Sequence, residues 1–148
     1  MPTARRSRTI GAPASDLWEI VRDPHHLPRW WPRVERVEDV LDGAFTEVMR
    51  TSKGKVVRAD FDLLSSDEQR RALRWSQRVQ GTPFGRVLRS SETEVSIEPA
   101  RDPQATDVTI ELRQVLNGFF PRFGGHMVRR AARATLDEAL DGLERISG

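Results

Sequence analysis

Residues 126–146 constrain the fold more than any other stretch of the sequence. Apolar residues recur there at the helical period, so they form one stripe, while charged residues mostly occupy the opposite face. A helix of this length is about 30 Å long, enough to cross a whole domain. Along the stripe the residues grow in size, from Ala131, Ala132 and Thr135 to Leu136, Leu140, Leu143 and Ile146.

This change in size predicts two different environments along one helix. Protein interiors are packed nearly solid, so small residues either admit another backbone or leave a space. Because the upstream sequence is rich in strand patterns, we expect a space. The first half of the helix would then roof a cavity and the second half would close its floor.

The upstream sequence predicts a curved antiparallel sheet. Alternating apolar residues and turn signals indicate an edge strand at 4–10, two short helical segments ending near Asp23-Pro24 and Pro32, and about six further strands. The expected further strands are 34–41, 45–51, 56–64, 70–80, 87–98 and 106–116, with a polar turn at 65–69. One face of such a sheet needs a cover, and the last helix is long enough to supply it. The expected fold is therefore an α+β helix grip of about seven strands, forming a single domain over residues 1–148.

Composition excludes several classes of function. The 148 residues contain no cysteine, which removes disulfides, thiolate metal sites and cysteine nucleophiles. The three histidines form no metal motif, so we expect no metal or other cofactor. Basic and acidic residues are interspersed and the net charge is only +2, which argues against a nucleic-acid partner. No signal peptide or stretch of about 18 apolar residues is evident, so we expect a cytoplasmic monomer or homodimer without stable membrane insertion.

Four stretches resemble a known family. They are APASDLWEIV at 12–21, DPHHLPRWWP at 23–32, Glu98-Pro99 followed by TDVT at 106–109, and LDEALDGL at 136–143. In this order they are similar to START-like domains, the superfamily of the birch pollen allergen, and most to its branch named polyketide cyclase/dehydrase and lipid transport. The resemblance implies a helix-grip fold with a cavity for apolar molecules such as lipids, sterols, polyketides or quinones. It does not determine the chemistry, since such folds serve carriers, sensors and cyclases.

Several side chains are candidates for the cavity wall. Strand parity turns Phe61, Leu63, Leu73 and Trp75 inward, along with apolar residues of the last two strands. Met49 joins them only if the turn at Lys53-Gly54 has the longer of two registers. Trp30 is expected in the core, whereas Trp31 either gates the mouth or joins the core. The expected ligand-binding residues are Trp31, Phe61, Trp75, Gln77, Phe84, Arg89, Leu112, Gln114, Phe120, Met127, Arg130, Ala131 and Thr135.

Three functional hypotheses follow from these residues. The first is a carrier that holds a hydrophobic or amphipathic small molecule by burial. Gln77, Gln114 and, if it shares the side of Val87, Arg89 are expected to point inward, where each would pair either with a ligand oxygen or with a neighbouring backbone group or water. The second is a polyketide cyclase/dehydratase-like enzyme, for which His126 is the candidate acid–base group. The third is a protein-interaction module that uses an exposed strand edge. The arginines near the start of the last helix, Arg130 among them, indicate either a solvated face or a site for an anionic headgroup.

Overall fold

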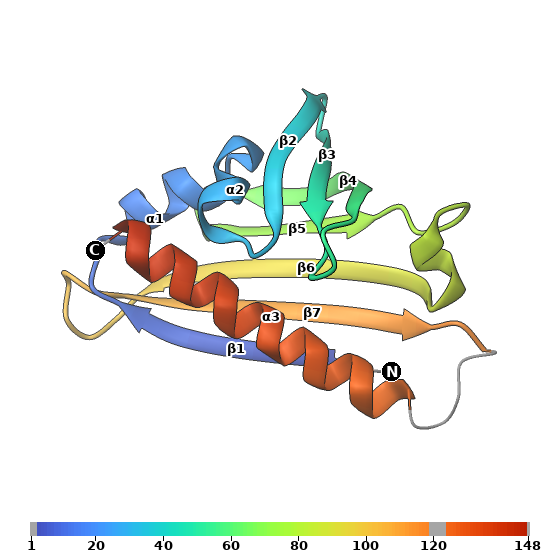
Figure 1. The fold of residues 1–148 in the computed structure, drawn as a ribbon. Coiled ribbons are helices and arrows are strands. Elements are labelled where there is room, and N and C mark those ends of the chain that lie inside the picture. Colours follow the sequence, from blue (N-terminus) through green and yellow to red (C-terminus); the bar gives the residue numbers. More distant parts are fainter. Residues whose placement is uncertain (1–2, 119–123, 148) are drawn as a thin grey trace.

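The computed structural model describes residues 3–118 and 124–147, which form an antiparallel sheet wrapped around one long helix (Figure 1). The elements are β1 (Thr3–Ile10), α1 (Ala14–Val21), η1 (Pro24–His26), α2 (Leu27–Trp30), β2 (Val34–Leu41), β3 (Ala44–Arg50), β4 (Val56–Asp67), β5 (Ala72–Gln77), η2 (Pro83–Arg86), β6 (Leu88–Pro99), β7 (Thr106–Leu116) and α3 (Gly124–Ser147). The predicted α+β helix grip is confirmed.

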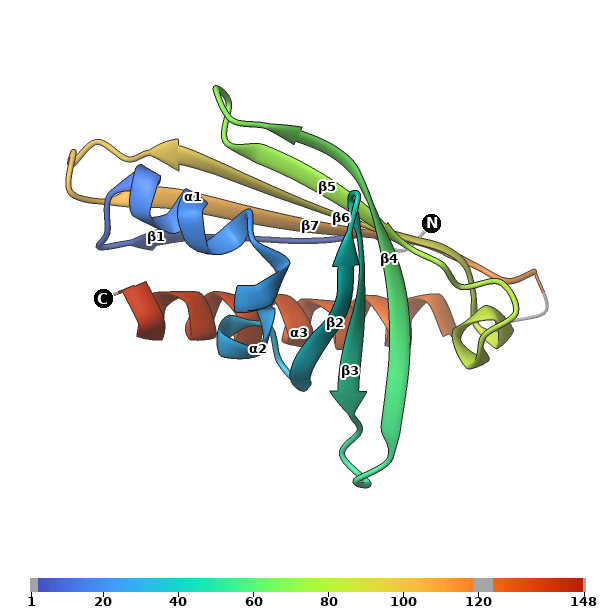
Figure 2. The ribbon, with the colours of Figure 1, turned by 90° about the horizontal axis from the view of Figure 1, so that it is seen from above.

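The sheet is strongly curved. Its order is β1-β7-β6-β5-β4-β3-β2, so the first two strands of the chain form the two edges. Register shifts interrupt the β2–β3, β4–β5 and β6–β7 pairs, and such bulges bend and twist a strand. As a result β1 and β7 run along α3, whereas β2, β3 and β4 pass across it (Figure 2).

The second half of α3 is the centre of the core. Leu136, Leu140 and Leu143 are buried as predicted, and Glu144 is exposed. Arg129, which was expected to be exposed, is half-buried. Full burial of a leucine side chain is worth about 1.5–3 kcal/mol, so these three positions anchor the helix firmly.

Helix α3 also touches the backbone of α2. A Cβ atom added at Gly142 would lie 2.3 Å from the carbonyl oxygen of Trp30 and 2.9 Å from its Cα. Real atoms do not approach so closely, so glycine is needed for this crossing. Trp30 itself is buried, as expected for a core residue.

Arginines of β1 pair with the acidic residues of α3. Arg6 donates from Nε to Asp137 at 3.1 Å, and Arg8 pairs with Asp141 and with Glu144. Acidic residues near a helix C-terminus oppose its dipole, and these contacts offset that cost. Each partly exposed pair contributes less than about 1 kcal/mol to the stability of the protein. The pairs therefore fix the orientation of the helix but add little to the free energy of unfolding.

The β4–β5 connection differs from the prediction. Strand β4 continues to Asp67, so the turn expected at 65–69 begins later, and β5 covers only Ala72–Gln77. The Asp67 carboxylate accepts hydrogen bonds from the backbone N–H groups of Gln69 and Arg70, which closes a tight turn. The bulge after Leu63 also changes the strand's parity. Leu63 itself lies before the bulge and keeps the expected face: it is paired with Trp75, and both line a smaller hollow of about 220 Å³, where Leu63 is 41% exposed.

The contact between Gly142 and Trp30 can be tested by adding one methyl group. Gly142→Ala should destabilise the protein by about 1–3 kcal/mol through overpacking, although alanine is the better helix former by about 1 kcal/mol. Urea unfolding measures the change. Gly125→Ala is the matched control in the same helix, because its new Cβ would meet only a Leu116 methyl group at an ordinary 3.7 Å. Equal effects of the two substitutions would contradict the close crossing.

Candidate functional site

A cavity of about 680 Å³ lies between the concave face of the sheet and the first half of α3. Val128, Ala131, Ala132 and Thr135 are the α3 residues that line it. Because these side chains are small, the helix fills less space here than its leucine-rich second half does. The volume lies within the range of about 300–1,000 Å³ that is usual for small-molecule sites.

Most of the cavity wall is apolar and aromatic. The apolar and aromatic residues from the sheet and its connections are Trp31, Met49, Val57, Phe61, Trp75, Pro83, Phe84, Val87, Leu88 and Leu112. The rings of Trp31 and Trp75 lie 6.1 Å apart at 70°, an edge-to-face arrangement. Met49 faces inward because Arg50 pairs with Val56, which gives the connecting turn its longer register. The exposed residues Arg33, Thr51 and Ser52 mark the mouth.

A row of polar side chains crosses this apolar wall. Gln77 on β5 is paired with Phe61, and Ser91 on β6 is paired with Gln114 on β7. Among the described residues, Nε2 of Gln77 and Oε1 of Gln114 are buried and have no hydrogen-bond partner. A buried polar atom left unpaired costs about 1–3 kcal/mol. Both residues line the cavity, so rotation of either amide would present its unpaired atom to a polar group there.

Among the described residues, Glu47 on β3 is the ionisable group buried in this wall. It is only 2% exposed, and no group in residues 3–118 or 124–147 donates a hydrogen bond to its carboxyl. Burial raises the pKa of Glu47 to about 8. The two arginines at the mouth are engaged elsewhere: Arg50 pairs with Glu35 at 2.5 Å, and Arg33 with Glu138 at 3.8 Å. Glu47 is thus mostly protonated at neutral pH while the cavity holds no cation.

Sequence reasoning did not select Glu47, although a signal was present. Glu47 shares its strand face with Phe45 and Met49, and it is paired with Ala59 on β4. The parity of this strand depends on the register of the turn at 51–55. Once that register is known, the same alternation that turns Met49 inward also turns Glu47 inward.

Most of the predicted ligand-binding residues are brought together in the cavity wall. Those that line it are Trp31, Phe61, Trp75, Gln77, Phe84, Leu112, Gln114, Ala131 and Thr135. Met127 is 69% exposed, and neither it nor the exposed Arg130 lines the cavity. Phe120 lies outside the described residues.

Arg89 was expected to face inward if it shared the side of Val87, and it does not, because Val87 lines the cavity and Arg89 does not. Leu88 is paired with Leu116 and Ser90 with Val115, so Arg89 is the extra residue of a bulge in β6. The bulge removes Arg89 from the alternating pattern of the strand. Its side chain is exposed and borders hollows outside the main cavity.

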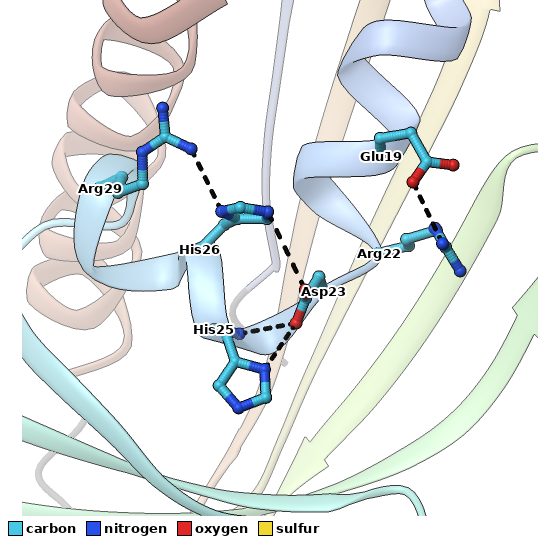
Figure 3. A network of polar contacts seen from close by, with 6 residues as sticks. All are labelled: Glu19, Arg22, Asp23, His25, His26 and Arg29. Carbon is cyan, nitrogen blue, oxygen red and sulfur yellow. Dashed lines mark hydrogen bonds and ion pairs between the residues drawn. The ribbon is translucent and has the colours of Figure 1, made fainter.

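The histidines do not contribute to the cavity wall. His126 is exposed and is not among the lining residues. His25 and His26 belong to a polar network at the α1–α2 junction (Figure 3). Asp23 accepts hydrogen bonds from the backbone N–H of His25 at 3.0 Å and from its Nδ1 at 2.9 Å, and so caps η1. Burial raises the pKa of Asp23, but the hydrogen bonds from His25 outweigh it, so that the pKa lies below its ordinary value.

The described residues contain no cluster of three or more histidine, aspartate or glutamate side chains that could hold a metal ion. In the same part of the chain, no helix is long and apolar enough to cross a membrane.

A sheet that grips a C-terminal helix over such a cavity defines the START-like class of ligand-binding fold. The chain belongs to the polyketide cyclase/dehydrase and lipid transport family, whose family model matches residues 1–148. No curated protein matches the chain by sequence.

Solved structures of low sequence identity share this fold. A START superfamily protein from Mycobacterium smegmatis has a TM-score of 0.79 and 18% identity, over 98% of this chain and 96% of that one. The di-domain ARO/CYC BexL from the BE-7585A biosynthetic pathway has a TM-score of 0.81 and 21% identity, over 98% of this chain and 46% of its own. A protein from Thermobifida fusca has a TM-score of 0.76 and 21% identity, over 100% and 94% of the two chains.

The burial of Glu47 predicts how stability depends on pH. The folded state holds the Glu47 proton more tightly than the unfolded state, so the stabilisation is full below the ordinary pKa of 4.5 and is lost as the pH rises through about 8. Between these limits the free energy of unfolding should fall by up to about 1.4 kcal/mol per pH unit. Glu47→Gln should remove this contribution, as measured by urea unfolding across the pH range.

Glu98→Gln is the control for that experiment, because Glu98 is an exposed glutamate that does not line the cavity. This control should retain the slope of the wild type. If Glu47→Gln and the wild type have the same slope, Glu47 is not buried as a neutral acid.

Proposed function

We propose that the protein binds a hydrophobic or amphipathic small molecule, such as a lipid or polyketide, in the cavity between the sheet and α3. The observation that carries the proposal is the cavity of about 680 Å³ beneath Ala131, Ala132 and Thr135. A ligand in it would gain about 25 cal/mol for each Å² of apolar surface removed from water. Family membership supports the same function.

The apolar wall would supply affinity and the polar groups would set orientation. Phe61, Trp75 and Leu112 lie on the sheet side of the cavity, and Ala131 and Thr135 lie on the helix side. A flat or chain-like hydrocarbon body would pack between these two surfaces. Trp31 and Phe84 come from the connections before β2 and before β6, so they would close around the ligand from outside the sheet.

Gln77 and Gln114 would bind the polar part of the ligand. Their unpaired amide atoms include one donor and one acceptor, so a hydroxyl group could satisfy both. Such contacts cost the ligand little in free energy, because the amides are already desolvated in the cavity wall. They would also distinguish an amphipathic ligand from a plain hydrocarbon.

A cyclase/dehydratase-like enzyme is the second candidate, and Glu47 is the observation that favours it. General acid–base catalysis needs an ionisable group in the pocket with a pKa near the working pH. Burial gives Glu47 a pKa of about 8, whereas His126 lies outside the cavity wall. An enzyme that depends on Glu47 should lose about 10²–10⁴-fold in rate in Glu47→Gln while still binding substrate. A carrier would form no new product from a polyketide-like compound in either variant.

The site can be tested by filling it from the helix side. Ala131→Phe and Thr135→Phe should each weaken binding of the neutral dye N-phenylnaphthylamine by about tenfold or more, because the new ring would occupy the ligand's volume. Stability should change by less than the roughly 1–3 kcal/mol that overpacking a core costs. Fluorescence titration and urea unfolding measure the two effects.

Ala134→Phe is the matched control, since Ala134 is an exposed residue of the same helix that does not line the cavity. It should bind the dye like the wild type. Unfolding by Ala131→Phe or Thr135→Phe at unchanged dye affinity would show that these positions are packed core and that the dye binds elsewhere.

A further inference from the structure

We propose that the polar group of the ligand is a positively charged amine, which Glu47 binds as a carboxylate inside the cavity. This inference rests on the proposed function and specifies the chemical class of the ligand. Three features of the cavity wall support it: an uncompensated acidic group, neighbouring aromatic rings, and arginines that are already paired.

Glu47 is the only ionisable side chain in the wall, among the described residues, that has no counter-ion. The lining residues of β4, β5, β6, β7 and α3 include no ionisable group, and the mouth contributes Arg33 and Arg50. Both arginines pair with glutamates outside the wall, Glu138 and Glu35. When Glu47 ionises, the cavity therefore carries an unbalanced negative charge. Such a charge attracts a cation and repels the carboxylate of a fatty acid.

The aromatic residues suit an organic cation. Trp31, Trp75 and Phe61 line the same cavity as Glu47, and the two tryptophan rings are strongly inclined to each other. Ring faces attract ammonium groups, most strongly where water is excluded, and aromatic cages are the usual sites for quaternary ammonium. A carboxylate beside such rings provides both the charge and the apolar contact that an alkylammonium group needs.

A neutral polar ligand would not need this carboxyl. The amides of Gln77 and Gln114 already provide a donor and an acceptor for a hydroxyl or carbonyl group. The Glu47 carboxyl is unpaired and 2% exposed, so its burial lowers the stability of the protein. A neutral ligand would leave that cost uncompensated. Binding of a cation would restore the charge balance, with release of the Glu47 proton to solvent.

Three probes with the same eight-carbon tail can test the charge of the ligand. They are octyltrimethylammonium, octanol and octanoate, used below micelle-forming concentrations and titrated by displacement of N-phenylnaphthylamine. At about pH 8 the cation should bind about tenfold tighter than octanol, which corresponds to about 1.4 kcal/mol, and octanoate should bind most weakly. At about pH 6, calorimetry in buffers of different ionisation enthalpy should show release of close to one proton per cation bound.

Variants of Glu47 test whether its carboxylate causes the cation preference and the proton release. Glu47→Gln should abolish both the preference for the cation over octanol and the proton release. Glu47→Asp keeps the charge and should retain part of the preference, and Glu98→Gln should behave like the wild type. Equal affinity of the wild type for octanol and the cation, or a preference that survives Glu47→Gln, would overturn the inference.

If the protein does not bind small molecules in this cavity at all, the experiment gives a different result from a failure of the cation preference. If neither the dye nor any of the three probes binds the wild type, the cavity is not a ligand site. If the dye binds, and octanol binds at least as tightly as the cation, the cavity is a ligand site but its preference for a cation is wrong.

Discussion

Uneven packing along α3 is the constraint on which the rest of the structure depends. At one end Gly142 lets the helix meet the backbone of Trp30, and Leu136, Leu140 and Leu143 fill the space below the sheet. This end fixes the distance of the helix from the strands. The other end carries small residues, which leave unfilled part of the space that the curved sheet encloses. The cavity follows from one rigid helix that has two side-chain sizes.

The same arrangement explains how the protein tolerates a buried acid. Glu47 lines the cavity beneath the first half of α3 and lies outside the space that Leu140 and Leu143 fill. The cavity wall also contains buried core residues, among them Phe61, Trp75 and Ala132, whose burial offsets the desolvation cost of the carboxyl. The second half of α3 is therefore packed core, and the first half borders the cavity.

The sequence predicts the regular parts of this structure and misses what depends on single-residue irregularities. The helical period identifies Leu140 as core and Ala131 as cavity wall, because a long helix keeps its phase. Strand parity places Gln77 correctly, because no bulge separates it from Trp75. Parity fails at Arg89, where a bulge adds one residue, and at Glu47, whose face depends on the register of the turn at 51–55. Bulges and turn registers are set by contacts with neighbouring strands, which no local pattern encodes.

The location of the ligand site can be measured directly by methyl-resolved NMR during a titration with octanol, a neutral probe that does not depend on the charge of Glu47. The methyl signals of Met49, Leu112 and Val128 should shift and saturate together, because these residues line the cavity. Those of Leu136 and Leu143 should not shift, because these residues are fully buried in the anchored half. Saturable shifts confined to Leu136 and Leu143, or no saturable shifts at any cavity methyl group, would contradict the account.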